Sequence, residues 1–336
     1  MPNGYPRHRK DPMVAATEPR LYCVGGSLAP GDAEVDLVAP DGAPPGPWTA
    51  ESGYRWCERI AASHHENFPV ASRFLPTHLR PHVAAIYAFA RTADDFADEP
   101  RFEGRRTQSL DAWEALLEGC YHREVQHPVF IALRDTVRAH NIPIGPLQAL
   151  LTSFRMDLVK HRYGTFRELL DLCAHSANPV GQLVLLVHGH REPELHRFSD
   201  EVCSALQLAN FLQDLSVDIP RGRVYLPVED LEHFGVRTED LLAQRPTREL
   251  AELLHFEIAR VRAMFHRGRP LVRKVSPGLS MELDATWRGG MAILDRVEAL
   301  GASTLVTRPT LGRGDMAGIA ARSLVSFGRR FLRGDA

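Results

Sequence analysis

A group of carboxylates follows an apolar run in the stretch YAFARTADDFADE, residues 87–99. Its last six positions hold four acids, Asp94, Asp95, Asp98 and Glu99. On a helix, residues three and four positions apart share a face, so these acids continue a stripe that begins at Tyr87 and Arg91. Carboxylates beside apolar side chains must meet cations or water. We interpret the stripe as a site where metal ions hold a diphosphate; a solvated acidic face is the alternative for this cluster alone.

A second polar stripe lies in EVCSALQLANFLQDLSVDIPRGRVYLP, residues 201–227. Its members are spaced by three, four and four positions: Gln207, Asn210, Asp214 and Asp218. A solvated surface has no need for two apolar helices that each carry such a stripe. If they face each other across a bundle, their oxygen atoms can surround Mg²⁺, which prefers oxygen ligands and commonly bridges carboxylates to phosphates. A di-iron bundle would instead need Glu-x-x-His motifs, which neither helix has.

The elements that must position these stripes are helices. From residue 49 to about residue 308, apolar residues recur at spacings of three and four, and strand signals are nearly absent. The predicted helices cover residues 110–123, 129–140, 146–160, 166–174, 179–189, 199–219 and 250–269. Proline and glycine breakers such as NIPIGP separate them. The pattern predicts a single all-α domain.

The two ends of the chain differ from this domain. Residues 1–48 are rich in Pro and Gly and lack apolar periodicity, which predicts a flexible tail. Residues 309–336 predict a basic amphipathic helix. Its apolar line consists of Met316, Ala320, Leu324, Phe327 and Phe331, and Arg322, Arg329, Arg330 and Arg333 lie off that line. Such a helix suits the surface of an anionic membrane; packing onto the domain is the alternative.

Composition limits the classes of function. A chain of 336 residues with 44% apolar content can bury a large core, and a net charge of -2 gives no reason to expect nucleic acid as a partner. Five cysteines without a CxxC pair suit reduced thiols in the cytoplasm. We find neither a membrane-spanning run nor a secretory signal, so we expect a cytoplasmic protein, peripheral to the inner face of the membrane if the last helix binds lipid.

The acid motifs resemble those of a known group of enzymes. The DxxxD of Asp94 and Asp98, the NxxxDxxxD that begins at Asn210 and the RGRVYLP that follows are similar to the head-to-head trans-isoprenyl diphosphate synthases, which include squalene and phytoene synthases. ENFPVASRFLP (66–76), RPHVAAIYAFARTADDFADE (80–99) and SANPVG (176–181) most resemble bacterial hydroxysqualene synthases of hopanoid biosynthesis. The resemblance covers about residues 55–312 and implies an isoprenoid synthase helical bundle with a central cavity.

The resemblance also implies a set of site residues. The implied Mg²⁺ ligands are Asp94, Asp98, Asn210, Asp214 and Asp218. The implied diphosphate-binding residues are Asn67, Arg91, Gln207, Arg221 and Arg223. Of these, Arg91 is expected to be catalytic together with Tyr225 and Asn178.

The implied reaction is Mg²⁺-dependent ionisation and rearrangement of presqualene diphosphate, a lyase reaction in which water captures the cation to give hydroxysqualene. No reductant is needed. Ionisation requires positive charge at the leaving oxygens, and the cation requires a dry, apolar pocket. The implied partners are an isoprenoid diphosphate substrate and related synthases of the same pathway.

Departures from the family pattern bear on the product. Leu172 stands where squalene and dehydrosqualene synthases have a Tyr that is linked with the condensation to presqualene diphosphate, and Asn178-Pro179 replaces Ala-Gly. Both favour an enzyme that begins from presqualene diphosphate, with Asn178 orienting the water or merely starting a helix. One alternative is condensation of two allylic diphosphates to presqualene diphosphate, squalene or phytoene. Another is a non-catalytic subunit that binds a related synthase. The Arg155-x-Asp157 pair is placed either at the diphosphate mouth or on a salt-bridged face.

Overall fold

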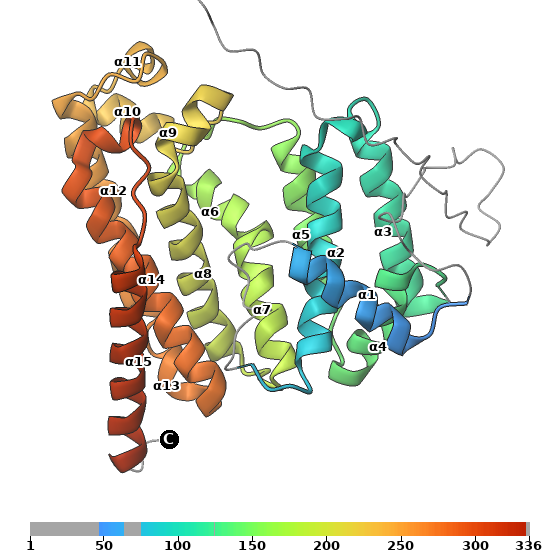
Figure 1. Ribbon diagram of the computed structural model, residues 1–336. Helices are drawn as coiled ribbons and strands as arrows, with labels where there is room; N and C mark the ends of the chain where they lie inside the picture. Colours follow the sequence, from blue (N-terminus) through green and yellow to red (C-terminus); the bar gives the residue numbers. More distant parts are fainter. Residues whose placement is uncertain (1–46, 64–74, 124, 334–336) are drawn as a thin grey trace, which may run out of the picture. The chain divides into compact units, whose positions relative to one another are not determined.

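The computed structural model describes residues 47–63, 75–123 and 125–333, with side chains up to residue 328. The chain divides into two units, residues 1–46 and 47–336, and only the second contains described residues. The predicted flexible tail therefore lies almost wholly outside the described residues, and the boundaries at residues 48 and 308 stay predictions. Within the described ranges the chain forms helices and no strand, which confirms the predicted all-α fold (Figure 1).

The helices follow one another with short connections. They are α1 (Ala50–Ser63), α2 (Arg80–Asp98), η2 (Pro100–Phe102), α3 (Arg106–His122), α4 (Pro128–His140), α5 (Gly145–Asp157), α6 (Phe166–His175), α7 (Ala177–Val187), α8 (Pro193–Gln213), α9 (Leu215–Asp218), η3 (Ile219–Arg221), α10 (Val228–Phe234), α11 (Thr238–Leu242), α12 (Arg248–Gly268), α13 (Leu271–Lys274), α14 (Pro277–Leu300), η4 (Gly301–Leu305) and α15 (Arg313–Arg333). None of the described helices combines the length and apolar character needed to span a bilayer.

Local sequence explains where several helices begin and end. Thr165 caps α6 by accepting a hydrogen bond from the Glu168 N–H, and Thr247 caps α12 in the same way. Pro occupies the first turn of α4, where its missing N–H costs nothing. That helix ends at Asn141, whose φ of 46° lies in the left-handed region that Asn tolerates.

One predicted helix is wrong in its extent. Residues 199–219 were expected to form a single helix, but α8 begins earlier, at Pro193, and ends at Gln213. Asp214 leaves helical geometry with φ -98° and ψ 15°, and the short α9 follows. The last acid of the second stripe, Asp218, therefore lies on a separate short helix rather than on α8.

Helix α8 lies at the centre of the core and packs against α7, α12 and α14. Its contact with α7 is close at Gly181, where an added Cβ would lie 2.3 Å from Ser199 Oγ and 2.5 Å from Cys203 Sγ. Only a residue without a side chain fits there. The described cysteines are free thiols and are mostly buried.

The two stripe-bearing helices end on the same side of the bundle. In Figure 1 the C-terminal ends of α2 and α8 both lie at the upper end of the bundle, and that of α8 lies next to α9. Helix α7 packs against both of them.

Candidate active site

An ion pair joins the two acid motifs. Asp98, the last residue of α2, accepts a hydrogen bond at its Oδ1 from Arg223 Nη2 at 3.0 Å. Arg223 stands in the loop directly after η3, and 125 positions separate the two residues. The C-terminal ends of both stripes are thus brought into one site.

Other arginines hold the remaining acids. Arg91 Nη1 lies 3.2 Å from Asp94 Oδ2, and its Nη2 lies 2.8 Å from Asp95 Oδ1. Arg308 binds Asp214 with both Nε and Nη2, the latter 3.3 Å from Oδ2. Each of these acids is therefore compensated by a planar guanidinium, a group that also matches phosphate oxygens.

Asp218 is the least compensated acid of the second stripe. Burial raises the pKa of its carboxyl, and the neighbouring Asp214 raises it further. Three arginines oppose that rise, namely Arg223, Arg221 and Arg308. Asp214 and Asp218 thus share one electrostatic neighbourhood with these three arginines.

The donor set suits a hard cation. In the part of the chain that the structure describes, no group of three or more His, Cys, Asp or Glu side chains is placed to hold a metal ion, since arginines bind the acids. A guanidinium and a divalent cation are alternative partners for the same carboxylate. The available ligands are carboxylate and amide oxygens, the kind that Mg²⁺ accepts. The residues therefore fit Mg²⁺ by their chemistry.

Asp157 belongs to the same neighbourhood, although the sequence left its place open. Burial raises the pKa of this carboxyl to about 6; Arg223 opposes the rise and Asp98 adds to it. Its sequence neighbour Arg155 instead binds Asp111 and Glu114 at 2.7 and 2.8 Å, so Arg155 belongs to a salt-bridged helix face. The pair is thus divided between the two predicted alternatives.

Arg308 was not predicted as a site residue. It stands between Thr307 and Pro309, after η4 and outside the motifs that the sequence analysis identified. Only its position beside Asp214 identifies it.

Tyr225 is held in a stack of aromatic rings. Its ring lies parallel to that of Phe211 with centroids 3.8 Å apart, and the Tyr163 ring lies 5.8 Å away on a similar plane. Burial raises the pKa of Tyr225, and Asp157 raises it further, so its hydroxyl stays protonated and can donate. Such stacking fixes where that hydroxyl points.

Backbone pairing positions the loop that carries Arg223 and Tyr225. The Val224 N–H donates to His161 O at 2.9 Å, within an isolated bridge between Arg162 and Val224. A second bond runs from the Val228 N–H to Tyr163 O at 2.9 Å. The segment after α5 and the RGRVYLP loop are therefore joined side by side.

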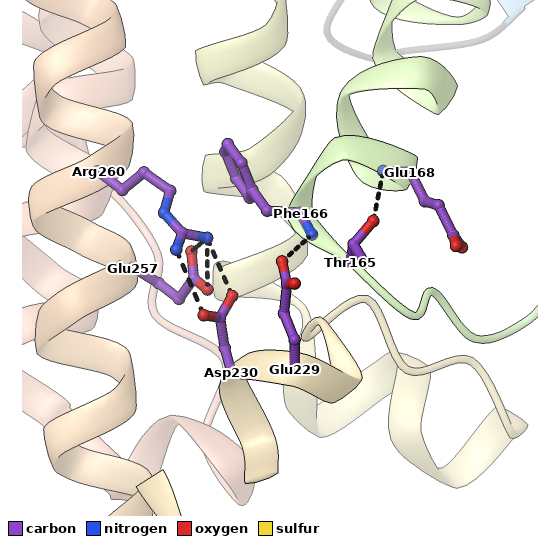
Figure 2. Close-up of polar contacts among 7 residues, drawn as sticks. All are labelled: Thr165, Phe166, Glu168, Glu229, Asp230, Glu257 and Arg260. Carbon is purple, nitrogen blue, oxygen red and sulfur yellow. Dashed lines mark hydrogen bonds and ion pairs between the residues drawn. The ribbon is translucent and has the colours of Figure 1, made fainter. Parts of the chain in front are cut away.

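A buried ionic network lies at the helix that follows this loop (Figure 2). Arg260 of α12 binds Asp230 of α10 at 3.0 Å and Glu257 at 3.2 Å, and its guanidinium lies over the Phe166 ring. The Glu229 carboxylate accepts a hydrogen bond of 2.7 Å from the Phe166 N–H. Helices α6, α10 and α12 are thus joined directly after the RGRVYLP loop.

Asn178 is the second residue of α7 and lies away from the acid cluster in sequence. Its Oδ1 accepts a hydrogen bond of 2.8 Å from the Ser204 hydroxyl on α8. Within the described residues its amide nitrogen makes no hydrogen bond, so it is available as a donor. Both a structural and a substrate-directed role are compatible with this arrangement.

The other predicted residues differ in exposure. Gln207 is half-buried on α8, whereas Asn210 and Arg221 are exposed. Asn67 lies outside the described residues. Leu172, where relatives carry Tyr, is buried in the core beside Tyr163.

Comparison with known proteins identifies the family. The model of the family described as squalene/phytoene synthase matches residues 61–315. The chain belongs to the squalene/phytoene synthase family. Membership makes it an enzyme of isoprenoid biosynthesis, and the residues described above lie in the part of the chain that the family shares.

Individual relatives carry different names. The chain is 31% identical over 265 residues to a phytoene synthase of Arthrospira platensis, covering 75% of this chain and 86% of that protein. It is 37% identical over 212 residues to the hydroxysqualene synthase of Rhodopseudomonas palustris, covering 62% of this chain and 71% of that protein. Among solved structures, the squalene synthase HpnC from Alicyclobacillus acidocaldarius is 41% identical with a TM-score of 0.72, covering 75% of this chain and 95% of that one.

Proposed function

We propose that this protein ionises and rearranges presqualene diphosphate and lets water capture the cation, giving hydroxysqualene. The Arg223–Asp98 ion pair carries the proposal, because it collects acids and arginines of both motifs where a diphosphate would need them. The 37% identity to a hydroxysqualene synthase supports the choice of product.

The first step is loss of the diphosphate. The motif residues Asp94, Asp98, Asn210, Asp214 and Asp218 would hold Mg²⁺, which would supply positive charge at the leaving oxygens. Arg91, Arg223 and Arg308 exchange their carboxylate partners for diphosphate oxygens. Their N–H groups act most strongly as negative charge grows on those oxygens, which lowers the barrier.

The second step is capture of the cation by water. Helix α7 is largely apolar and α8 buries mostly apolar residues, and we expect their side chains to keep bulk water from the cation. Asn178 projects from the start of α7 with its Oδ1 engaged by Ser204, so its amide nitrogen orients one water. That water gives up a proton as its oxygen bonds to carbon, and the released diphosphate accepts it.

A second candidate is condensation of two allylic diphosphates. The 31% identity to a phytoene synthase over most of both chains favours it. The buried Leu172 argues against it, because the Tyr that the resemblance links to condensation would supply a hydroxyl that Leu lacks. A non-catalytic subunit stays the third possibility, and binding of Mg²⁺ with pyrophosphate tests it.

The deciding experiment supplies each substrate separately. The purified chain with Mg²⁺ and without NADPH is incubated with farnesyl diphosphate or with presqualene diphosphate, and extracted lipids are analysed by mass. We expect hydroxysqualene from presqualene diphosphate and no product from farnesyl diphosphate. Presqualene diphosphate or phytoene-type products from allylic diphosphates would overturn the proposal in favour of condensation. Thermal stabilisation by Mg²⁺ plus pyrophosphate without any turnover would indicate a substrate not yet supplied, and no stabilisation would indicate a non-catalytic subunit.

A further inference from the structure

The outward face of α15 has an unusual composition. The helix lies along α14 (Figure 1), and its buried residues Ile319 and Ser323 are one turn apart, which defines the side packed onto the domain. Between residues 313 and 325 the exposed positions are Arg313, Gly314, Met316, Ala317, Ala320, Ala321, Arg322, Leu324 and Val325. The polar side chains among them are arginines only. A helix face that meets water normally carries many polar residues.

The apolar line predicted from the sequence is not the packed side. Met316 and Leu324 of this line are 56% and 53% exposed, and Val325, which follows Leu324 outside the line, is 54% exposed. Ile319 and Ser323 are the buried residues of α15, whereas Met316, Ala320 and Leu324 of the line stay exposed and Phe327 is half-buried. Large apolar side chains grouped on one exposed face mark an interaction surface.

The charge of this surface identifies its partner. The sequence of α15 contains five arginines and one acid, Asp315. Both oxygens of Asp315 lie 3.0 Å from Arg296 Nη2, so this carboxylate is neutralised by the domain. In the described part of the chain, neither Arg313 nor Arg322 forms an ion pair. The surface is therefore cationic and apolar together.

We propose that the outward face of α15 binds the surface of an anionic lipid bilayer, with Met316 and Leu324 entering the acyl boundary and the arginines contacting lipid phosphates. Apolar area and basic residues on one helix are the two contributions that hold interfacial helices on anionic membranes. A second copy of the chain fits less well, because the same face would bring arginines against arginines. Membrane binding by this helix is independent of the product that the enzyme forms.

Vesicle flotation of the full-length chain tests the proposal. We expect the chain to float with phosphatidylcholine vesicles that contain phosphatidylglycerol, to stay unbound with phosphatidylcholine alone, and to be released by high salt. Met316→Glu and Leu324→Glu each abolish flotation. Arg322→Gln lowers the partition coefficient about fivefold, the effect of one basic residue near an anionic surface.

The matched control is Leu242→Glu, which places the same charge on a residue of α11 that is 60% exposed. It should float like the unmodified chain. Absence of flotation, equal binding to neutral vesicles, or equal loss in Leu242→Glu would each overturn the proposal. Light scattering decides the remaining case: a dimer that Leu324→Glu dissociates would assign the face to a second copy instead.

Discussion

Arg223 Nη2 lies 3.0 Å from Asp98 Oδ1 and joins the end of α2 to the loop after η3. Without this pair, two groups of carboxylates would meet at the same end of the bundle and repel each other. The guanidinium offsets that repulsion and presents further N–H groups toward the same region. An arginine in this position can stabilise the ligand-free site and bind phosphate when the substrate arrives.

Replacing Arg223 tests this double role. We expect Arg223→Gln to lower kcat about a hundredfold, the usual effect of removing one preorganised donor to a developing anion. Arg223→Lys should recover only part of the rate, because Lys lacks the planar fork. Turnover of presqualene diphosphate measures both variants. The control is Arg237→Gln, whose Asp240 partner lies 2.8 Å away outside the site; a similar loss of rate there would contradict the assignment.

Arg308 competes with a cation for Asp214. In Arg308→Gln the carboxylate loses its guanidinium, so Mg²⁺ alone should bind more tightly. Pyrophosphate in the presence of Mg²⁺ should bind about tenfold more weakly, since a charge-assisted hydrogen bond is lost. Calorimetric titration measures both affinities, with Arg262→Gln, which removes an arginine bound to Asp295 and Glu298, as the control. If both affinities stay unchanged, Arg308 neither competes with a cation for Asp214 nor binds the diphosphate.

Two substitutions of Tyr225 test the contribution of its ring to stability and that of its hydroxyl to catalysis. Tyr225→Ala removes the contact with Phe211 and should lower the free energy of unfolding by about 2 kcal/mol. Tyr225→Phe keeps the stack and should leave stability nearly unchanged, while turnover falls about tenfold through loss of one hydrogen bond. Tyr121→Phe is the control, because that hydroxyl donates to Ile142 O away from the site. Full activity of Tyr225→Phe would exclude a role for the hydroxyl.

The network in Figure 2 predicts a large effect on stability. Asp230 and Glu257 are 6% and 4% exposed, so Arg260→Met leaves two buried acids without their cation. Chemical denaturation should show a loss of about 3–5 kcal/mol. Burial disfavours the charged form of Glu257 and raises its pKa, so adding Glu257→Gln, which removes one of the two acids, should recover part of that loss. Arg248→Met on the same helix, which breaks an exposed pair with Glu252, should change stability by less than about 1 kcal/mol.

His127 predicts a loss of stability in acid. Burial lowers the pKa of this imidazole to about 3, among the rings of Trp113 and Phe130. The unfolded chain takes up a proton below its usual pKa of about 6.5, and the folded chain does not. Stability from this residue is therefore complete above about pH 6.5 and is lost as the pH falls toward 3.

The matched variant is His127→Phe, which keeps an aromatic ring and removes the titration. Between about pH 7 and about pH 5, the unmodified chain should lose roughly 2 kcal/mol more than this variant. Denaturation at several pH values measures the difference. Parallel curves for the two proteins would mean that water reaches the imidazole and protonates it in the folded state.

The sequence predicts helices well where local signals and core periodicity agree. Residues 129–140 match α4 within one position, because Pro128 favours a start and Asn141 accepts the left-handed conformation that ends the helix. Residues 199–219 were predicted as one helix because the apolar pattern continues through Asp214. The break there coincides with the bond to Arg308, 94 positions away, which no local signal contains.

Some residues of the candidate site can likewise be predicted from local sequence, and others cannot. Asp94, Asp98 and Asp214 can be predicted as candidate site residues from sequence, because a stripe of acids on an apolar helix indicates that the acids bind a cation. Asp157 and Arg308 cannot, since their contribution depends on which distant residues fold beside them. The arginine partners of Asp98 and Asp214 are likewise properties of tertiary packing, whereas Arg91 pairs with Asp94 within α2.

The bridge between Arg162 and Val224 constrains the length of the RGRVYLP loop. In this extended segment Val224 is buried, while its neighbours Arg223 and Tyr225 are half-exposed. A shift by one residue would bury the positions of Arg223 and Tyr225 and place Val224 on the half-exposed side that faces the acids. Substitutions in this loop therefore change one residue at a time, but the insertion or deletion of a single residue would displace Arg223 and Tyr225 from the site together.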